Sequence, residues 1–189
     1  MLWAHLITAH LGLGEFTRAR DSLHSLWGKE EHFSGLDDRE RQQVQGLNVS
    51  FLASTEIYTT LDIDEVYHLS QTAMDLYPRD VDFGRSIGPG YHAVANYHLG
   101  NIPRAKGLLD QALKLSKRHA YSRLELLWIC YRAQIELDAG DLQQAEAYLN
   151  RALNIARQMG VQESNVVSNV IIGLGRLHYE RDRLDEAGT

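Results

Sequence analysis

The sequence has very few of the residues that break helices or cross-link a fold. It contains three prolines and one cysteine, Cys130, among 189 residues. Because proline is the strongest helix breaker, its scarcity leaves long stretches free to form helices. A single cysteine excludes an intrachain disulfide and a cysteine-based zinc site, which fits a reducing compartment, most simply the cytoplasm. No window approaches about 18 uncharged apolar residues, so we expect no transmembrane helix and no membrane partner.

Positive charge is also scarce. The chain has 19 basic and 25 acidic residues, which gives a formal net charge of −6 at pH 7. Direct binding of nucleic acid needs a basic face, so we do not expect nucleic acid to be a partner of this chain. The hydrophobic fraction of 44% is ordinary for a globular protein and excludes a disordered chain.

Motifs for catalysis, nucleotide binding and metal binding are missing. None of the nine histidines belongs to an H-E-x-x-H motif, and neither a P-loop nor a G-x-S-x-G elbow occurs. Cys130 lies in an apolar segment, so we expect a buried, inert thiol rather than a nucleophile. Most carboxylates stand at helix caps or on polar faces, and no pair is isolated in an apolar run as a general acid requires. The sequence therefore predicts a protein that is not an enzyme and that holds no cofactor or metal.

What the sequence does contain is a repeat of about forty residues. In each copy a helix-like apolar segment ends in a turn, and a small residue follows at a fixed distance. The five copies, aligned on that small residue, are 13–19, 60–66, 99–105, 139–145 and 181–187. The small anchors are Ala19, Val66, Ala105, Ala145 and Ala187, spaced by 47, 39, 40 and 42 residues. Small side chains at fixed positions predict that pairs of antiparallel helices approach closely.

The turns of the repeat carry residues that stop and start helices. Glycine tolerates the left-handed backbone at a helix C-terminus, and it stands in three turns, at Gly14, Gly100 and Gly140. Short polar side chains that accept from free backbone N–H groups follow at Asp62, Asn101 and Asp141. The pattern predicts helices at 1–13, 16–27, 38–60, 62–77, 84–99, 102–118, 121–139, 142–159 and 164–181, with a further helix beginning at 184. We expect the glycines between 84 and 90 to shape a helix start and Gly160 to stop a helix.

These boundaries predict a single domain of about four and a half repeats. Its repeats are 1–37, 38–80, 81–119, 120–160 and the incomplete 161–189. Half a hairpin cannot bury its apolar face, so we expect a fragment of a longer protein. The truncated last helix is then expected to expose an apolar face and to support self-association.

The repeat resembles the tetratricopeptide repeat, a helix-turn-helix unit of about 34 residues. The greater length of the repeats here is similar to that of the sensor domain of MalT-type transcriptional regulators of the LuxR class. The phrase that carries this second resemblance is the run 173–187, Gly-Leu-Gly-Arg-Leu-His-Tyr-Glu-Arg-Asp-Arg-Leu-Asp-Glu-Ala. The family has Asn more often where this chain has Asp182. The resemblance implies an all-α fold, a right-handed superhelix of tetratricopeptide-like helical hairpins, which is an α-solenoid.

The resemblance also implies where ligands bind. In such superhelices the first helix of each hairpin lines the concave surface. Carried over residue by residue, this gives the candidate binding positions Asn48, Thr55, Tyr58, Tyr97, His98, Gln134, Asp138, Arg176 and Tyr179. A mixture of polar and aromatic groups is typical of a surface that recognises a small molecule or a peptide. The alternative for the three tyrosines is packing between repeats, and the alternative for Gln134 and Arg176 is contact within the protein or with solvent.

Three functions from different classes remain open. The first is a ligand- or protein-sensing module of a bacterial transcriptional regulator, whose DNA contacts would come from a C-terminal domain outside this chain. The second is a generic tetratricopeptide scaffold that binds a peptide or protein without a role in transcription. The third, an all-helical enzyme, lacks a site that can be built from these residues. The partner expected from the first two is a small-molecule inducer, a protein or a peptide.

Overall fold

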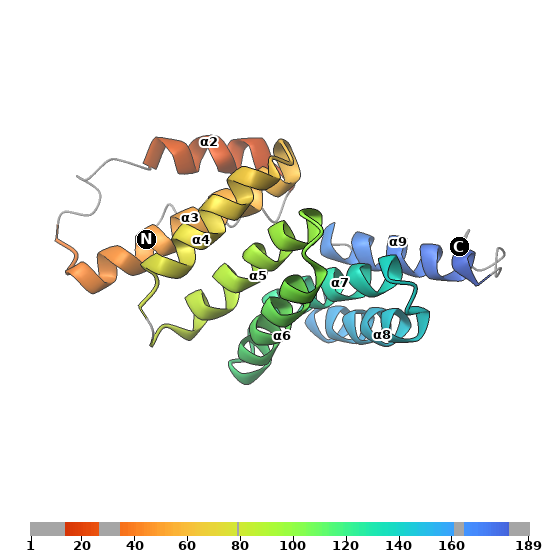
Figure 1. The fold of residues 1–189 in the computed structure, drawn as a ribbon. Coiled ribbons are helices and arrows are strands. Elements are labelled where there is room, and N and C mark those ends of the chain that lie inside the picture. Colours follow the sequence, from red (N-terminus) through yellow and green to blue (C-terminus); the bar gives the residue numbers. More distant parts are fainter. Residues whose placement is uncertain (1–13, 27–34, 79, 161–164, 182–189) are drawn as a thin grey trace. The chain divides into compact units, whose positions relative to one another are not determined.

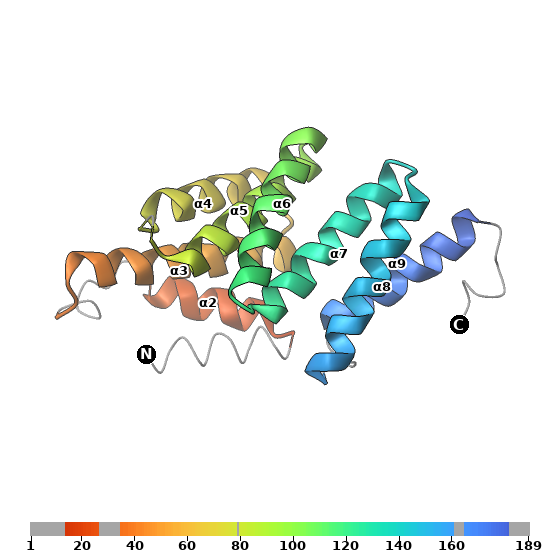
Figure 2. The ribbon, with the colours of Figure 1, turned by 90° about the horizontal axis from the view of Figure 1, so that it is seen from below.

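The computed structural model describes residues 14–26, 35–78, 80–160 and 165–181. Throughout these ranges the regular elements are α-helices (Figures 1 and 2). In chain order they are α2 (Phe16–Leu26), α3 (Asp38–Thr59), α4 (Ile63–Leu76), α5 (Asp82–His98), α6 (Ile102–Arg118), α7 (Ser122–Asp138), α8 (Leu142–Met159) and α9 (Asn165–Glu180). The predicted all-α fold of successive helical hairpins is therefore confirmed. No helix in the described ranges combines the length and the apolar character that a bilayer crossing demands.

The chain divides into two compact units, residues 1–108 and residues 109–189, and the division falls inside α6. In the first unit α3 packs against α2, α4 and α5, and in the second unit α7 packs against α8 and α9. The predicted helix at 1–13, the segment 28–34 and the predicted helix from 184 lie outside the described residues. The self-association expected through that last helix therefore stays a prediction.

The turns confirm the helix-stopping glycines and two of the three capping residues predicted from the sequence, whereas the Asn101 side chain donates to Oδ1 of Asn96 at 3.3 Å. Gly100 and Gly140 have φ angles of 79° and 75°, and Gly160 ends α8 with a φ of 67°. The Oδ1 atoms of Asp62 and Asp141 each accept a backbone N–H three residues later, at 3.0 Å. Short-range chemistry in the turns thus sets where the hairpins begin and end.

The small residues of the repeat lie at the helix contacts, as predicted. The described anchors and the alanines seven residues after them are fully buried, namely Ala19, Val66, Ala73, Ala105, Ala112, Ala145 and Ala152. Large apolar side chains fill the space around them, such as Leu23 and Leu52 in the first unit and Trp128 and Leu149 in the second. Each unit therefore has its own apolar core between closely spaced helices.

The glycines between 84 and 90 have a different role from the predicted one. They lie within α5, which begins at Asp82 and continues through this segment. A Cβ atom on Gly84 would lie 2.1 Å from Cγ of Tyr77, and one on Gly88 would lie 2.9 Å from Cγ of Met74. Gly84 and Gly88 are therefore needed for close packing of side chains at the end of α4 against α5, not for a helix start.

Candidate functional site

Three of the predicted binding residues meet on α7 and α9 in the second unit. The Nε2 atom of Gln134 donates to Oδ1 of Asp138 at 3.0 Å, one turn further along α7. The Nη1 atom of Arg176 on α9 donates to the same oxygen at 2.5 Å. Arg176 also lies 3.8 Å from a carboxylate oxygen of Glu180, measured from Nε. We call these four side chains the α7–α9 polar cluster.

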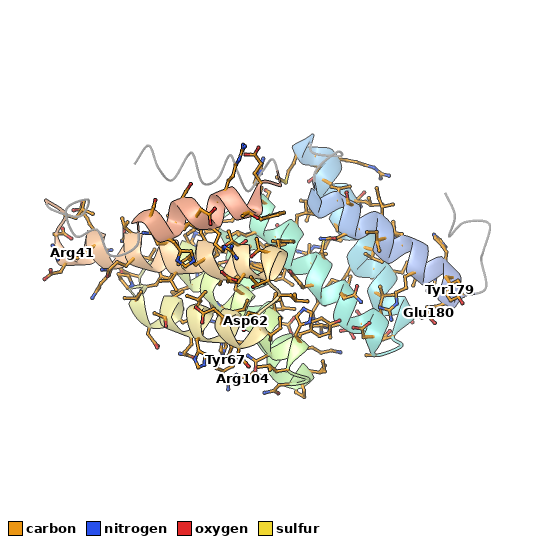
Figure 3. All side chains as sticks on the ribbon, turned by 90° about the horizontal axis from the view of Figure 1, so that it is seen from above. Arg41, Asp62, Tyr67, Arg104, Tyr179 and Glu180 are labelled. Atoms are coloured by element: carbon orange, nitrogen blue, oxygen red, sulfur yellow. The ribbon has the colours of Figure 1, made fainter. Side chains whose placement is uncertain are left out.

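The α7–α9 polar cluster lies at the surface. Asp138 and Glu180 are exposed, and Gln134 and Arg176 are half-buried. Tyr179 is 65% exposed at the end of α9, next to Glu180 in the chain (Figure 3). At this exposure Tyr179 is not buried among the described helices as a packing residue would be. An aromatic ring beside hydrogen-bonding groups is an arrangement that ligand and partner sites commonly use.

The charges of the α7–α9 polar cluster determine which ligand groups it can bind. Two carboxylates face one guanidinium, so the cluster has an excess of negative charge and can bind donors such as hydroxyl, amide and ammonium groups. Cys130, also on α7, is half-buried rather than fully buried as expected. Desolvation raises the pKa of its thiol to about 12, which favours the protonated form over the nucleophilic thiolate at neutral pH. Within the described ranges, no three His, Cys, Asp or Glu side chains come together as metal ligands would.

The candidates on α3, in the first unit, have different surroundings. Thr55 is fully buried, and its hydroxyl donates to the carbonyl oxygen of Leu52 at 2.8 Å. Asn48 is 1% exposed, and neither amide atom of its side chain has a hydrogen-bond partner. The structure therefore buries both residues and does not present them on an open face.

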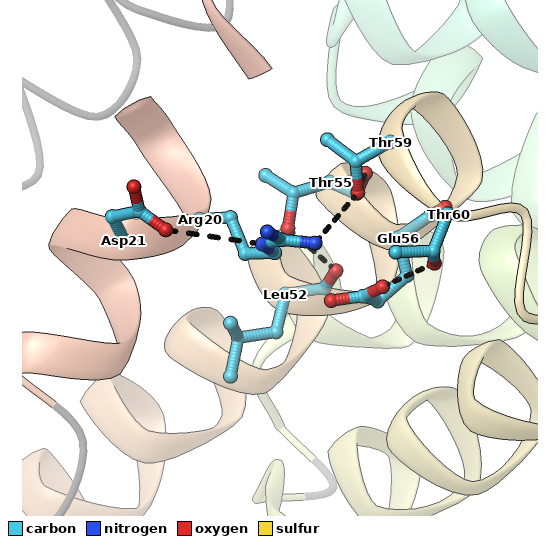
Figure 4. A network of polar contacts seen from close by, with 7 residues as sticks. All are labelled: Arg20, Asp21, Leu52, Thr55, Glu56, Thr59 and Thr60. Atoms are coloured by element: carbon cyan, nitrogen blue, oxygen red, sulfur yellow. Dashed lines mark hydrogen bonds and ion pairs between the residues drawn. The ribbon is translucent and has the colours of Figure 1, made fainter. Parts of the chain in front are cut away.

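Polar contacts within α2, at the end of α3 and between the two helices lie near Thr55 (Figure 4). The Nη1 atom of Arg20 lies 3.4 Å from the hydroxyl oxygen of Thr59, and its Nε atom lies 3.9 Å from Asp21. The hydroxyl of Thr60 donates to the carboxylate of Glu56 at 2.5 Å. Arg20 could not be identified from the sequence, because its partner lies 39 residues away on the next helix.

The aromatic candidates of the first unit lie in ring contacts. Tyr58 stacks on Phe16 of α2, with ring centroids 4.3 Å apart and an interplanar angle of 16°. Tyr97 contacts its neighbour His98, with ring centroids 4.9 Å apart. The contact of Tyr58 supports the packing interpretation that the sequence left open for it. The role of Tyr58, Tyr97 and His98 in binding stays a prediction.

Comparisons with known proteins give a family and a fold. The family model described as the MalT-like TPR region matches residues 49–189. The crystal structure of a Podosopora anserina putative kinesin light chain with nearly identical TPR-like repeats is similar, with a TM-score of 0.61 and 16% sequence identity. That likeness covers 98% of this chain and 88% of the other, and at this identity it shows the fold alone. No curated protein matches the sequence.

Proposed function

Because the chain belongs to the MalT-like TPR region family, we propose that it is a non-catalytic sensing module of a bacterial transcriptional regulator. It binds an inducer or a protein partner on the face formed by the first helices of the hairpins. The single observation that carries this proposal is the α7–α9 polar cluster, where Gln134, Asp138 and Arg176 from two repeats meet at the surface. We place the module in the cytoplasm, where such a regulator works.

The cluster suits a sensor because it joins two successive repeats. Asp138 belongs to α7 and Arg176 to α9, and their contact spans 38 residues of sequence. A ligand that competes for the Asp138 carboxylate changes the contact between these helices. The ligand must bind the two conformational states of a sensor with different affinity. A contact that the ligand makes or breaks provides that difference. DNA binding then belongs to a separate domain of the regulator.

A ligand screen with two matched variants tests the proposed site. The wild-type chain, Asp138→Asn with Arg176→Gln, and the control Arg181→Gln are compared by thermal shift against sugars, nucleosides, amino acids and short peptides. Arg181 is a suitable control because it also forms an ion pair between repeats, with Glu146 at 2.9 Å. We expect a ligand that raises the Tm of the wild type and the control but not of the double variant. A ligand that stabilises all three proteins equally contradicts the proposed site.

The alternative is a scaffold for a peptide or protein without a role in transcription. The similarity of the fold to kinesin light chain repeats is compatible with it, because TPR folds serve as interaction modules in general. The reading frame on both sides of the chain distinguishes the two functions. A regulator requires a nucleotide-binding P-loop domain upstream and a helix-turn-helix domain downstream, and the absence of both would favour the scaffold.

A further inference from the structure

The turn between α6 and α7 (Figure 2) carries a group of positive side chains in a chain that is acidic overall. The stretch 111–124 contains no acidic residue, and Lys114, Lys117, Arg118 and Arg123 are all exposed. None of these four side chains forms an ion pair with a residue that the structure describes. We call them the basic turn.

Backbone hydrogen bonds keep the basic turn compact. The N–H of Tyr121 donates to the carbonyl oxygen of Ser116 in α6 at 2.8 Å, and the N–H of Ser122 donates to that of Ala120 at 2.9 Å. Ala120 between them has a φ of 55°, the left-handed conformation that reverses the chain sharply. The last turn of α6 and the first turn of α7 are therefore tied together, which places Arg123 beside the basic end of α6.

Helix stability does not explain this arrangement. Lys117 and Arg118 stand in the last turn of α6, where positive charge is favourable. Arg123, however, lies in the first turn of α7, where the helix dipole disfavours a cation. Lys114 has like charges three and four residues further along α6 and one opposite charge, Asp110, four residues before it. The concentration of charge therefore has a cost in the free protein that an anionic partner would relieve.

We propose that the basic turn is a docking surface for a short acidic segment of a protein partner. Carboxylates of Asp or Glu side chains would pair with the lysine and arginine groups, and the arginines can bind them through two parallel hydrogen bonds. Nucleic acid fits less well, because its binding uses an extended basic face and the basic turn has only four cations. This surface is separate from the α7–α9 polar cluster and does not depend on the function proposed for it.

Fluorescence anisotropy with a labelled glutamate-rich peptide tests the proposal. The test variant is Lys117→Gln, Arg118→Gln and Arg123→Gln together. The control carries Arg18→Gln, Arg85→Gln and Arg157→Gln, which remove the same charge from exposed arginines elsewhere on the chain. We expect the wild type and the control to bind with a Kd that rises with salt, and the test variant to bind at least about tenfold more weakly. A peptide with glutamine in place of glutamate should not bind.

Three results would overturn the proposal. The first is no binding of the glutamate-rich peptide by the wild type at low salt. The second is an equal loss of affinity in both triple variants, which would show a diffuse effect of net charge. The third is tighter binding of single-stranded oligothymidine than of the peptide at the same salt, which would assign the basic turn to nucleic acid. Circular dichroism and thermal unfolding show that each variant keeps its fold, since all six substitutions are at exposed positions.

Discussion

The Nδ1 atom of His92 lies 3.0 Å from the Oγ atom of Ser70, and both side chains are fully buried between α4 and α5. The Ser70 hydroxyl donates its single proton to the carbonyl oxygen of Tyr67 at 3.0 Å. We therefore infer from this network that it accepts from His92, with the imidazole proton assigned to Nδ1. The Nε2 atom of His92 has no hydrogen-bond partner. The contact thus suits a neutral imidazole and offers no acceptor for a second proton.

We predict that acidification destabilises the protein through His92. Burial lowers the pKa of His92, and the positive charge of Arg104 lowers it further. In the unfolded chain His92 has an ordinary pKa of about 6.5 and binds a proton more readily than in the folded chain. The stability that the neutral, buried His92 contributes is therefore complete above pH 6.5. It is lost as the pH falls below 6.5 towards the lowered pKa of the folded state. Urea unfolding at several pH values should show a smaller loss on acidification for His92→Gln than for the wild type. An exposed-site control, His98→Gln, should follow the wild type.

We predict opposite effects for two glycine-to-alanine substitutions in helices. Gly84→Ala should destabilise the protein by about 1 to 3 kcal/mol, because its Cβ would lie 2.1 Å from the Tyr77 ring. Gly107→Ala should stabilise it by about 0.5 to 1 kcal/mol, because no atom lies within 4 Å of that Cβ and alanine favours the helix. Urea denaturation measures both free energies of unfolding. Equal effects of the two substitutions would contradict the packing of Tyr77 against α5.

We predict that Leu61 is strained in its turn. Its φ is 53° where the turns at Gly100 and Gly140 have glycine, and its side chain is 54% exposed. A leucine in the left-handed conformation costs about 1 to 2 kcal/mol. Glycine avoids this strain, and the extra conformational entropy that it loses on folding is a smaller cost. Leu61→Gly should therefore raise the Tm, and the reciprocal change Gly140→Ala should lower it. A lower Tm for Leu61→Gly would show that the leucine side chain forms a stabilising contact.

We predict that Asn48→Leu stabilises the protein. Both polar atoms of the buried Asn48 amide lack hydrogen-bond partners, and an unsatisfied buried group destabilises by about 1 to 3 kcal/mol. Leucine has a similar size without this penalty. Thermal unfolding in the absence of ligand measures the effect, with Thr55→Val as the comparison, because the Thr55 hydroxyl is hydrogen-bonded and its loss should destabilise. A lower Tm for Asn48→Leu would indicate that the amide has a structural partner.

Most of the secondary structure could be predicted because its signals are local. A glycine in the turn and an aspartate after it, as at Gly140 and Asp141, define the end of one helix and the start of the next within two residues. The role of the glycines in the segment 84–90 was predicted wrongly because it does not depend on local signals. Its glycines are explained by contacts with Tyr77 and Met74, and no pattern within the segment reveals those contacts.

The candidate site could be predicted only in part. The resemblance to tetratricopeptide superhelices implied that Gln134, Asp138 and Arg176 lie on the binding face, and the structure brings these three side chains together. The same reasoning assigned Asn48 and Thr55 to a binding face, yet both are buried. The position of a residue within the repeat gives the direction of its side chain from its own helix. It does not show which neighbouring elements cover that side chain.

The sequence by itself determined the repeat, its helices and its turns, because each depends on the chemistry of a few consecutive residues and on the spacing of small side chains. The tertiary structure alone decided which polar groups pair. Asp138 meets Arg176 and Ser70 meets His92 across 38 and 22 residues of sequence. Hydrogen bonds require separations near 3 Å, and only the packed helices bring such distant residues within that range.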